Sequence, residues 1–211
     1  MTLHEMASAL MLLLREGSIS DDEKLDIRLV KDLIKTKRAE YIGLLNGQRG
    51  EVSSNNMQHI DVDMELLSNG ILRSTEKLPR IIASKVGKVI DDISVPETFG
   101  TIDFTYVNSK RLPVVGNGKY NQNLVYATVA EDYLLLKAKN HAFRLITKCE
   151  VEAAFEDPTD VEGFNDMVDE YPIDVQGFEY IKKAMFKEDL TYFLMGSSDL
   201  SNNADGEIIQ K

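Results

Sequence analysis

The sequence is poor in features that would each point to a familiar class of protein. It has one cysteine, Cys149, which excludes an intramolecular disulfide and a zinc site built from several cysteines. Its longest apolar run, residues 9–14, is far too short to cross a bilayer. The opening residues 1–5 lack the basic stretch that begins a secretory signal peptide, so we expect none.

The chain also lacks net positive charge. Its 211 residues carry 24 Lys and Arg against 35 Asp and Glu, a formal net charge of -11, which excludes nucleic-acid binding driven by overall basic charge. The excess is uneven, because residues 1–50 and 51–150 are each neutral, whereas residues 151–211 carry 4 basic and 15 acidic side chains. No Lys or Arg occurs within residues 150–181. We therefore expect the last part of the chain to differ in role from the rest.

The remaining composition is that of a folded α+β protein. Hydrophobic residues make up 43% and charged residues 28%, which is typical of globular chains, and a chain of this length buries about 70% of its unfolded surface. We expect an αα-hairpin at 1–50 and an antiparallel β domain, a sandwich or barrel, at 51–157. An acidic segment and C-terminal helix that pack on the N-terminal helices follow at 158–196, and an extended polar tail or arm at 197–211.

Two helices are predicted within residues 1–50. Thr2 with Glu5, and Ser20 with Glu23, have the spacing of a capping box at a helix start. The expected buried faces carry Leu3, Met6, Leu10, Leu13 and Leu14, then Leu25, Leu29, Leu33, Ile34, Tyr41, Leu44 and Leu45. The other face of the second helix carries Lys24, Arg28, Lys31, Lys35 and Arg38. A basic face can contact nucleic acid, but the interleaved acidic residues favour a solvated face or a protein contact.

Short strands are predicted in the middle of the chain. Apolar and acidic residues alternate over 60–66, the pattern of a strand with one wet face. Residues 125–130 and 133–138 flank Glu131-Asp132 and predict a hairpin. Further strands are expected at 102–107, 143–147 and 151–155, and a helix at 173–190. Close spacing of short strands is typical of an antiparallel sandwich or barrel.

No catalytic motif is present. The histidines His4, His59 and His141 lie far apart without metal-ligand spacing, so surface positions are favoured. Asp61, Asp63 and Glu65 share one strand face, which permits a metal-dependent hydrolase or nuclease as an alternative. A solvent-facing edge is favoured, because these carboxylates have no calcium-loop glycine around them and no histidine joins them nearby. We therefore predict neither an enzyme nor a bound cofactor or metal.

A set of short motifs resembles a family of virion proteins from crAss-like and related Bacteroidetes phages. The motifs occur in the family's order nearly end to end, at 1–5, 13–23, 37–40, 155–158, 171–173, 181–183, 187–188, 199 and 202–205. The resemblance implies a neck or tail-barrel ring protein, a head–tail connector of the portal-adaptor type. Such proteins form rings around the DNA channel, commonly of twelve copies, with a C-terminal arm that grips a neighbour.

This resemblance sets the expected partners and place of action. They are the portal protein and neighbouring tail-ring proteins, while DNA passes through without specific binding and no membrane is involved. The protein would be made in the host cytoplasm and reside in the virion neck or tail. A transient assembly chaperone, binding through its acidic C-terminal region and then leaving, is a second alternative.

Two groups of residues are predicted to act at surfaces. The candidates for a protein interface are Phe178, Ile181, Met185, Phe186 and Leu200. The candidates for an acidic channel lining are Glu156, Asp157, Asp160, Glu162, Asp166, Asp169 and Glu170. Negative charge there would keep DNA from sticking. The same stretch can also dock onto a basic neighbouring ring or form an ordinary solvated surface.

Overall fold

The computed structural model describes residues 1–14, 26–85, 87–95, 104–115, 124–139 and 141–189. The chain forms two compact units, a helical unit from Met1–Tyr41 with Asn165–Lys211 and a β unit from Ile42–Phe164. The β unit is therefore inserted in sequence between two parts of the helical unit. The capping box expected at Ser20 and Glu23 and the tail expected at 197–211 lie outside the described residues.

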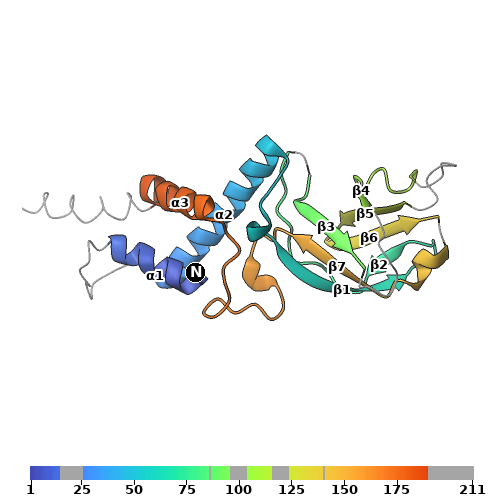
Figure 1. Ribbon diagram of the computed structural model, residues 1–211, viewed down its shortest axis with the longest axis horizontal. Helices are drawn as coiled ribbons and strands as arrows, with labels where there is room; N and C mark the ends of the chain where they lie inside the picture. The colour runs from blue at the N-terminus through green and yellow to red at the C-terminus, as the bar shows by residue number, and fades with distance from the viewer. Residues whose placement is uncertain (15–25, 86, 96–103, 116–123, 140, 190–211) are drawn as a thin grey trace, which may run out of the picture. The chain divides into compact units, whose positions relative to one another are not determined.

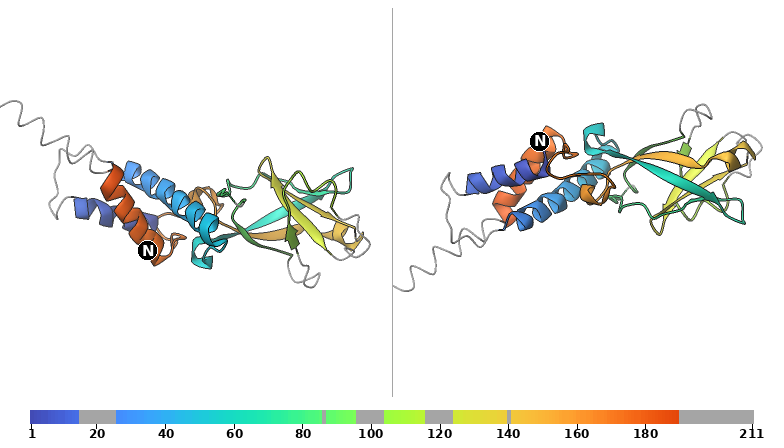
Figure 2. Two further views of the ribbon diagram at one scale, coloured as in Figure 1. Left: turned by 90° about the horizontal axis from the view of Figure 1, so that it is seen from above. Right: turned by 90° about the horizontal axis from the view of Figure 1, so that it is seen from below.

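The helices are α1 (Leu3–Leu14), α2 (Ile27–Arg49) and α3 (Val175–Ala184), the last followed by a π-helical turn, η5 (Met185–Asp189). Figure 2 shows α1, α3 and the first part of α2 together in the helical unit. The capping box at the start of α1 is confirmed, since Thr2 N donates to Glu5 Oε2 at 2.9 Å and Glu5 N donates to Thr2 Oγ1 at 3.1 Å. At the start of α3, Asp174 Oδ1 accepts from Gly177 N at 2.6 Å.

The buried faces of the two N-terminal helices differ in part from the expectation. The buried side chains of α1 are Leu3, Met6, Ala7, Leu10 and Met11, whereas Leu13, expected among them, is exposed. Within the helical unit, α2 buries Val30, Ile34, Lys37, Arg38 and Tyr41. Leu29 and Leu44, expected on the buried face, are exposed. Ile34 and Tyr41 confirm part of the predicted face, and Arg38, which was placed on the basic face, is buried beside them. The buried face is therefore rotated relative to the prediction, because apolar periodicity does not reveal a basic side chain that packs inside the unit.

The β unit is a nearly closed barrel of seven strands. The strands are β1 (Gln58–Leu66), β2 (Leu72–Ser74), β3 (Ile90–Ser94), β4 (Phe104–Tyr106), β5 (Val125–Ala130), β6 (Tyr133–Ala138) and β7 (Lys148–Ala153). They are arranged in the order β3-β7-β1-β2-β6-β5-β4 (Figure 1). The α+β class and the barrel alternative are confirmed. One correction applies to the antiparallel sheet, because β4 pairs with β5 in parallel.

The hairpin of β5 and β6 confirms the turn predicted at Glu131-Asp132. Ala130 pairs with Tyr133, and the two turn residues have φ angles of 54° and 66°. Positive φ at both positions is the signature of a type I′ turn, whose twist matches that of the flanking strands. The turn therefore sets the register of the whole hairpin.

Residues 143–147, expected as a strand, instead belong in part to a 3₁₀ turn, η3 (His141–Leu145). Phe143 and Ile146 are both buried, and Ile146 N donates to Phe143 O at 3.2 Å. Two buried residues three positions apart fit a helical turn, whereas a strand requires a spacing of two. Two further 3₁₀ turns are η1 (Ser54–Asn56) and η4 (Pro158–Asp160).

The barrel interior is filled by apolar side chains, and β5 is covered on its outer face as well. Tyr126 and Thr128 point outward from β5 and are nevertheless buried. On the neighbouring strand, Lys137 is the register partner of Tyr126, and its Nζ donates to Leu112 O at 3.1 Å and Pro113 O at 2.7 Å. Segment 107–115 therefore lies over the outer face of β5 and β6.

Candidate interaction surfaces

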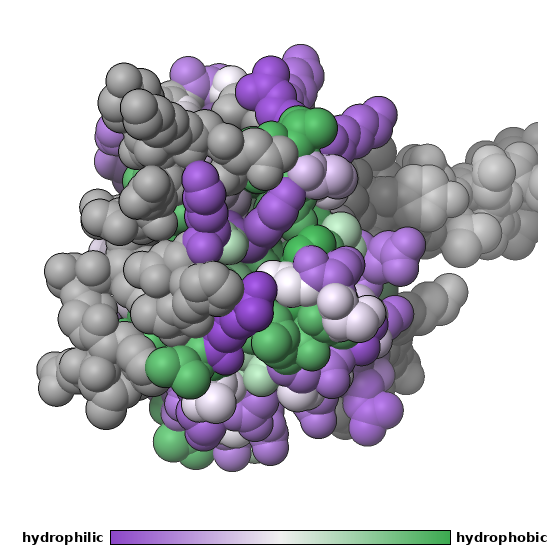
Figure 3. All heavy atoms as spheres, turned by 90° about the vertical axis from the view of Figure 1, so that its right-hand side faces the viewer, coloured by the Kyte–Doolittle hydropathy of each residue, from purple (hydrophilic) through white to green (hydrophobic). Residues whose placement is uncertain are grey.

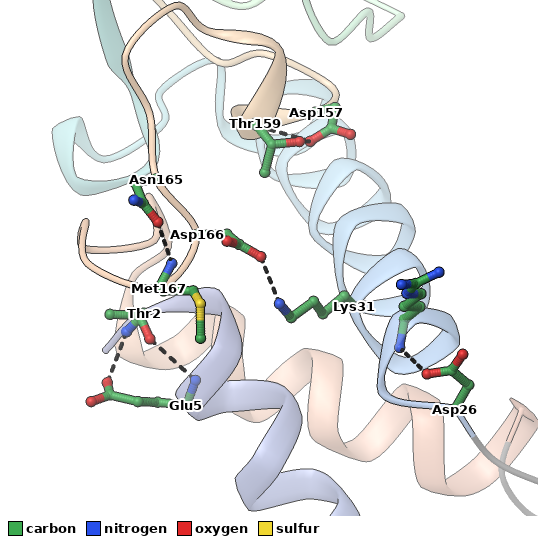
Figure 4. Close-up of polar contacts among 10 residues, drawn as sticks. Thr2, Glu5, Asp26, Lys31, Asp157, Thr159, Asn165, Asp166 and Met167 are labelled. Atoms are coloured by element: carbon green, nitrogen blue, oxygen red, sulfur yellow. Dashed lines mark hydrogen bonds and ion pairs between the residues drawn. The ribbon is translucent and has the colours of Figure 1, made fainter.

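A tight turn at residues 165–170 projects two apolar side chains from the helical unit. Asn165 N donates to Asp169 Oδ2 at 2.6 Å. Met167 N donates to Asn165 Oδ1 at 3.0 Å (Figure 4). Val168 N and Asp169 N both donate to Asn165 O, at 3.1 and 2.8 Å. Polar groups of the turn therefore hold its shape, while Met167 and Val168 at its tip are 59% and 73% exposed.

The same turn is tied to both N-terminal helices. His4 N donates to Asp166 O at 3.2 Å, and Tyr171 N donates to Met1 O at 3.0 Å. Lys31 of α2 donates to Asp166 Oδ2 at 2.6 Å (Figure 4). That hydrogen bond is the main reason why the pKa of Asp166 lies below its ordinary value, and nearby positive charge adds to the effect. The turn is thus a fixed part of the helical unit.

The basic side chains of α2 are largely used inside the helical unit. Arg38 is fully buried, its Nε donates to Pro172 O at 2.7 Å, and its guanidinium lies 5.6 Å from the centre of the Tyr171 ring. Lys31 pairs with Asp166. The expectation that this face is solvated or meets a partner is therefore wrong for Lys31 and Arg38, and Lys24 lies outside the described residues.

The interface candidates on α3 separate into two groups. Ile181 and Met185 are fully buried within the chain, whereas Phe178 and Phe186 are half-buried. Gly177 explains how closely α3 packs, because a Cβ there would lie 2.7 Å from Tyr41 Cε1 and from Ile173 Cγ1. Ile181 and Met185 therefore belong to the core of the helical unit, and Leu200 lies outside the described residues.

The acidic candidates belong to both units and differ in their contacts. In the β unit, Asp157 caps η4 by accepting from Thr159 N at 2.9 Å (Figure 4). In the helical unit, Asp166 and Asp169 stabilise the turn at 165–170. The exposed acidic candidates are Glu156, Asp160, Glu162 and Glu170. Glu156 lies 4.0 Å from Arg80, and Glu170 lies 3.3 Å from the ammonium group of Met1.

The carboxylates proposed as a metal site face cations or solvent. Asp63 lies 3.7 Å from Lys148, and Glu65 lies 2.6 Å from Arg73, while Asp61 is exposed opposite Glu150. Among the described residues no three His, Cys, Asp or Glu side chains are placed to hold a metal ion. The geometry favours the solvent-facing edge over a hydrolase site.

Cys149 lies inside the barrel on β7 and is fully buried. Burial raises the pKa of its thiol to about 12, because the thiolate is poorly solvated there. Since the thiolate is the reactive form, the folded protein keeps this cysteine inert. Cys149 is therefore a buried strand residue of the barrel core.

An open hollow of about 470 Å³ lies on the β unit at the turn between β1 and β2. It is lined by Leu66, Leu67, Ser68, Asn69, Gly70 and Arg144. The turn is closed by Leu67 N donating to Ile71 O at 2.8 Å, and Gly70 has a φ of 78°. Figure 3 views the side of the β unit on which this turn lies in Figure 1, and hydrophobic side chains reach the surface there among hydrophilic ones.

Sequence reasoning missed both the projecting turn and the hollow. The turn has a readable signal, because Asn and Asp side chains favour turns by accepting hydrogen bonds from nearby backbone N–H groups, and Asn165 and Asp169 do so here. The hollow has none, because Arg144 joins a turn more than seventy positions earlier in the chain. None of the described helices combines the length and apolar character that a membrane span requires.

Comparison with known proteins places the chain in a structural family. No curated protein matches it significantly. The family described as phage tail ring protein 2, from crAss-like phages, matches residues 5–208, which is nearly the whole chain. It is a family of ring-forming structural proteins of the virion tail, not of enzymes. Its description agrees with the resemblance carried by the short motifs, and the chain belongs to this phage tail ring protein family.

Proposed function

We propose that this tail ring protein forms the ring that joins the portal to the tail, with the DNA channel through its centre. The observation that carries the proposal is the stretch 150–181, which contains no Lys or Arg and presents several exposed carboxylates. A lumen through which DNA moves must not hold it, and a negative wall repels phosphates. A tail ring protein can occupy several positions along the tail. The acidic stretch is the observation that supports a position between the portal and the tail.

Three exposed members of the acidic set line the channel in this proposal, namely Glu156, Asp160 and Glu162. The fourth, Glu170, lies beside the Met1 ammonium group and is not assigned to the channel. Asp157, Asp166 and Asp169 support the local fold through hydrogen bonds, and we assign them a positioning role. The carboxylates of the channel wall repel the DNA phosphates, so no specific DNA binding is expected.

The proposed ring has twelve copies and contacts the portal on one side and another tail-ring protein on the other. The half-buried side chains of Phe178 and Phe186, together with Leu200 in the C-terminal arm, contribute to contacts with neighbours. Ile181 and Met185 support these contacts from within the core. Copies that contact one another through two different surfaces form a closed ring when the rotation between neighbouring copies divides a full turn evenly.

A reconstruction of purified particles by electron microscopy tests the proposal. We expect twelve copies directly below the portal, with the exposed carboxylates of residues 156–162 facing the lumen. A ring placed lower in the tail would contradict the portal contact. A lumen lined by another surface of the chain would contradict the proposed role of the acidic residues.

The transient assembly chaperone is the alternative that the same particles address. A chaperone leaves before maturation, whereas a ring component stays in the particle. Quantitative mass spectrometry of mature particles and of assembly intermediates separates the two. Absence of the chain from mature particles would contradict both the proposed position and its structural role.

A further inference from the structure

Copies of a ring protein meet their neighbours through two different surfaces, because a ring is built from head-to-tail contacts. The described part of the chain offers one surface that projects and one that is hollow. The projecting surface is the turn at 165–170 of the helical unit, and the hollow lies between the β1–β2 turn and Arg144 of the β unit. A head-to-tail contact requires two different and complementary surfaces on the same chain, and these two meet that requirement in shape.

The projecting turn is preorganised for binding. Its backbone is fixed by Asn165 and Asp169, and Lys31 anchors it through Asp166. A contact made by a fixed turn has little conformational entropy to lose. Met167 and Val168 are large apolar side chains held in solvent, and Met adapts to irregular gaps. Asp166 and Asp169 beside this apolar pair are engaged with Lys31 and Asn165 N, and the exposed acidic side chain of Glu170 follows them.

The hollow contains one arginine among polar and leucine side chains, and another leucine is exposed beside it. Leu66 in its wall is 47% exposed, and Leu145 beside Arg144 is 64% exposed. Arg144 makes no hydrogen bond or ion pair with any residue that the structure describes. A volume of about 470 Å³ exceeds that of one methionine side chain and lies in the range of small binding pockets. The exposed leucines and the arginine of the hollow thus suit an apolar tip that is followed by an exposed carboxylate.

We propose that, in the ring, the turn at 165–170 of one copy docks into the hollow at the β1–β2 turn of the next copy. Met167 and Val168 fill the space beside Leu66. The carboxylate of Glu170, whose exposed contact with the Met1 ammonium group leaves it accessible, pairs with the guanidinium of Arg144. Arginine binds carboxylates through two parallel N–H groups, which fixes orientation as well as adding attraction. The proposal requires only that copies form a ring, and it holds wherever that ring lies in the particle.

Cysteine cross-linking of the full-length chain tests the contact. The variant with Val168→Cys and Leu66→Cys is treated with a short bis-maleimide, which reports weak association because the covalent product accumulates. The natural thiol of Cys149 does not interfere, because it is buried with a pKa of about 12. We expect a ladder of dimers, trimers and larger products. A mixture of the two single-cysteine variants should give dimers only, each containing one chain of either kind.

A control variant with two cysteines at positions outside the proposed contact measures the background of nonspecific cross-linking. Lys110 is exposed on the β unit outside the hollow, so Lys110→Cys with Val168→Cys should form at least tenfold less product. Equal ladders from both double variants would overturn the proposal, as would the absence of a ladder from the Val168 and Leu66 pair. In purified particles, cross-linking of Val168→Cys to a different tail protein would also overturn it, because the partner would not be a second copy.

Exchanging the two charges tests the pairing itself. Arg144→Glu and Glu170→Arg should each lower the cross-linked yield of the double-cysteine chain at least tenfold, because each places like charges together. The two changes combined should restore most of the yield. Lys110→Glu and Asp92→Arg carry the same charge changes at other exposed positions and should leave the yield unchanged. No restoration in the combined variant would overturn the pairing of Glu170 with Arg144.

Discussion

The helical unit and the β unit are stabilised in different ways. The β unit has an apolar interior set by strand register, with buried side chains from β1, β2, β3, β5, β6 and β7. The helical unit depends more on polar contacts between distant parts of the chain. Lys31 binds Asp166, Arg38 binds the Pro172 carbonyl and Tyr41 binds Asp174, with sequence separations of 135, 134 and 133 residues. Removing buried side-chain volume should therefore lower the stability of the β unit most. Removing single hydrogen bonds should lower the stability of the helical unit most.

The largest effect is expected from a cavity in the barrel. Leu136 on β6 is fully buried, so Leu136→Ala should lower the free energy of unfolding of the β unit by about 3 kcal/mol. Hydrogen exchange read strand by strand measures this loss. Leu135→Ala, at a half-buried neighbour on the other face of β6, should cost less than half as much. If α1 and α3 lose as much protection as the strands, the two units are not separately stabilised.

The next largest effect is expected from the buried arginine of the helical unit. Arg38→Met keeps much of the side-chain volume but leaves the Pro172 carbonyl without its donor at 2.7 Å. We expect a loss of about 2 kcal/mol, confined to amides of α1, α2 and α3. Arg28→Met, at an exposed position on α2, is the control and should be nearly neutral. A neutral Arg38→Met would show that burial of its aliphatic stem matters more than its hydrogen bond.

The ion pair of Lys31 and Asp166 should contribute about 1 kcal/mol or less, because the Asp166 side chain is 34% exposed. The pKa of Asp166 is lower in the folded state, so its contribution is complete above the unfolded pKa and is lost as pH falls through the folded pKa. Lys31→Met should therefore be destabilising at pH 7 and almost neutral near pH 2. Denaturant titrations at the two pH values measure the difference. A cost that grows toward low pH would contradict this sign.

A small gain is expected at the β5–β6 turn. Glu131 has a φ of 54°, a backbone conformation that residues other than Gly, Asn and Asp rarely adopt. Glu131→Asn should stabilise the β unit by about 0.5 kcal/mol and leave Asp132 in place. Glu131→Ala removes the same carboxylate without easing the backbone and should bring no gain. Equal melting temperatures for the two variants would show that the side chain, not the backbone, determines the energy of the turn.

The smallest effect on folding is expected from removing residues 197–211. The segment is polar, with Leu200 and the residues at 208–209 as its large apolar side chains, so it adds little to a core. Its deletion should leave the melting temperature of the free chain unchanged while weakening ring assembly. Hydrogen exchange and sedimentation of the same sample report the two effects separately. A collapse of the helical unit after deletion would show that the tail belongs to its core.

Local patterns predicted well where a few neighbouring residues determine the structure. The capping box of Thr2 and Glu5, the turn at Glu131-Asp132 and the alternation in β1 depend on contacts within the pattern or on one adjacent strand. Composition and spacing identified an α+β protein, and the order of short motifs pointed to the family.

Long-range contacts account for what the sequence could not predict. The buried face of α2 was misplaced because Arg38 finds its acceptor at Pro172, far along the chain. The parallel pairing of β4 with β5 depends on a connection that contains no periodic signal. Ile181 and Met185 were taken for interface residues because an amphipathic helix shows one apolar face, and only the structure reveals that this face packs inside the chain.

The insertion of the β unit within the helical unit has a consequence for synthesis on the ribosome. The β unit, Ile42–Phe164, is complete in sequence before Asn165–Lys211 is made, so the barrel can fold while α1 and the first half of α2 still wait for α3. At about 5–20 residues per second, the wait from residue 41 to residue 165 lasts roughly 6–25 s. The helical unit and its projecting turn form last. A truncated chain therefore lacks this unit, and only a finished one presents both surfaces to a growing ring.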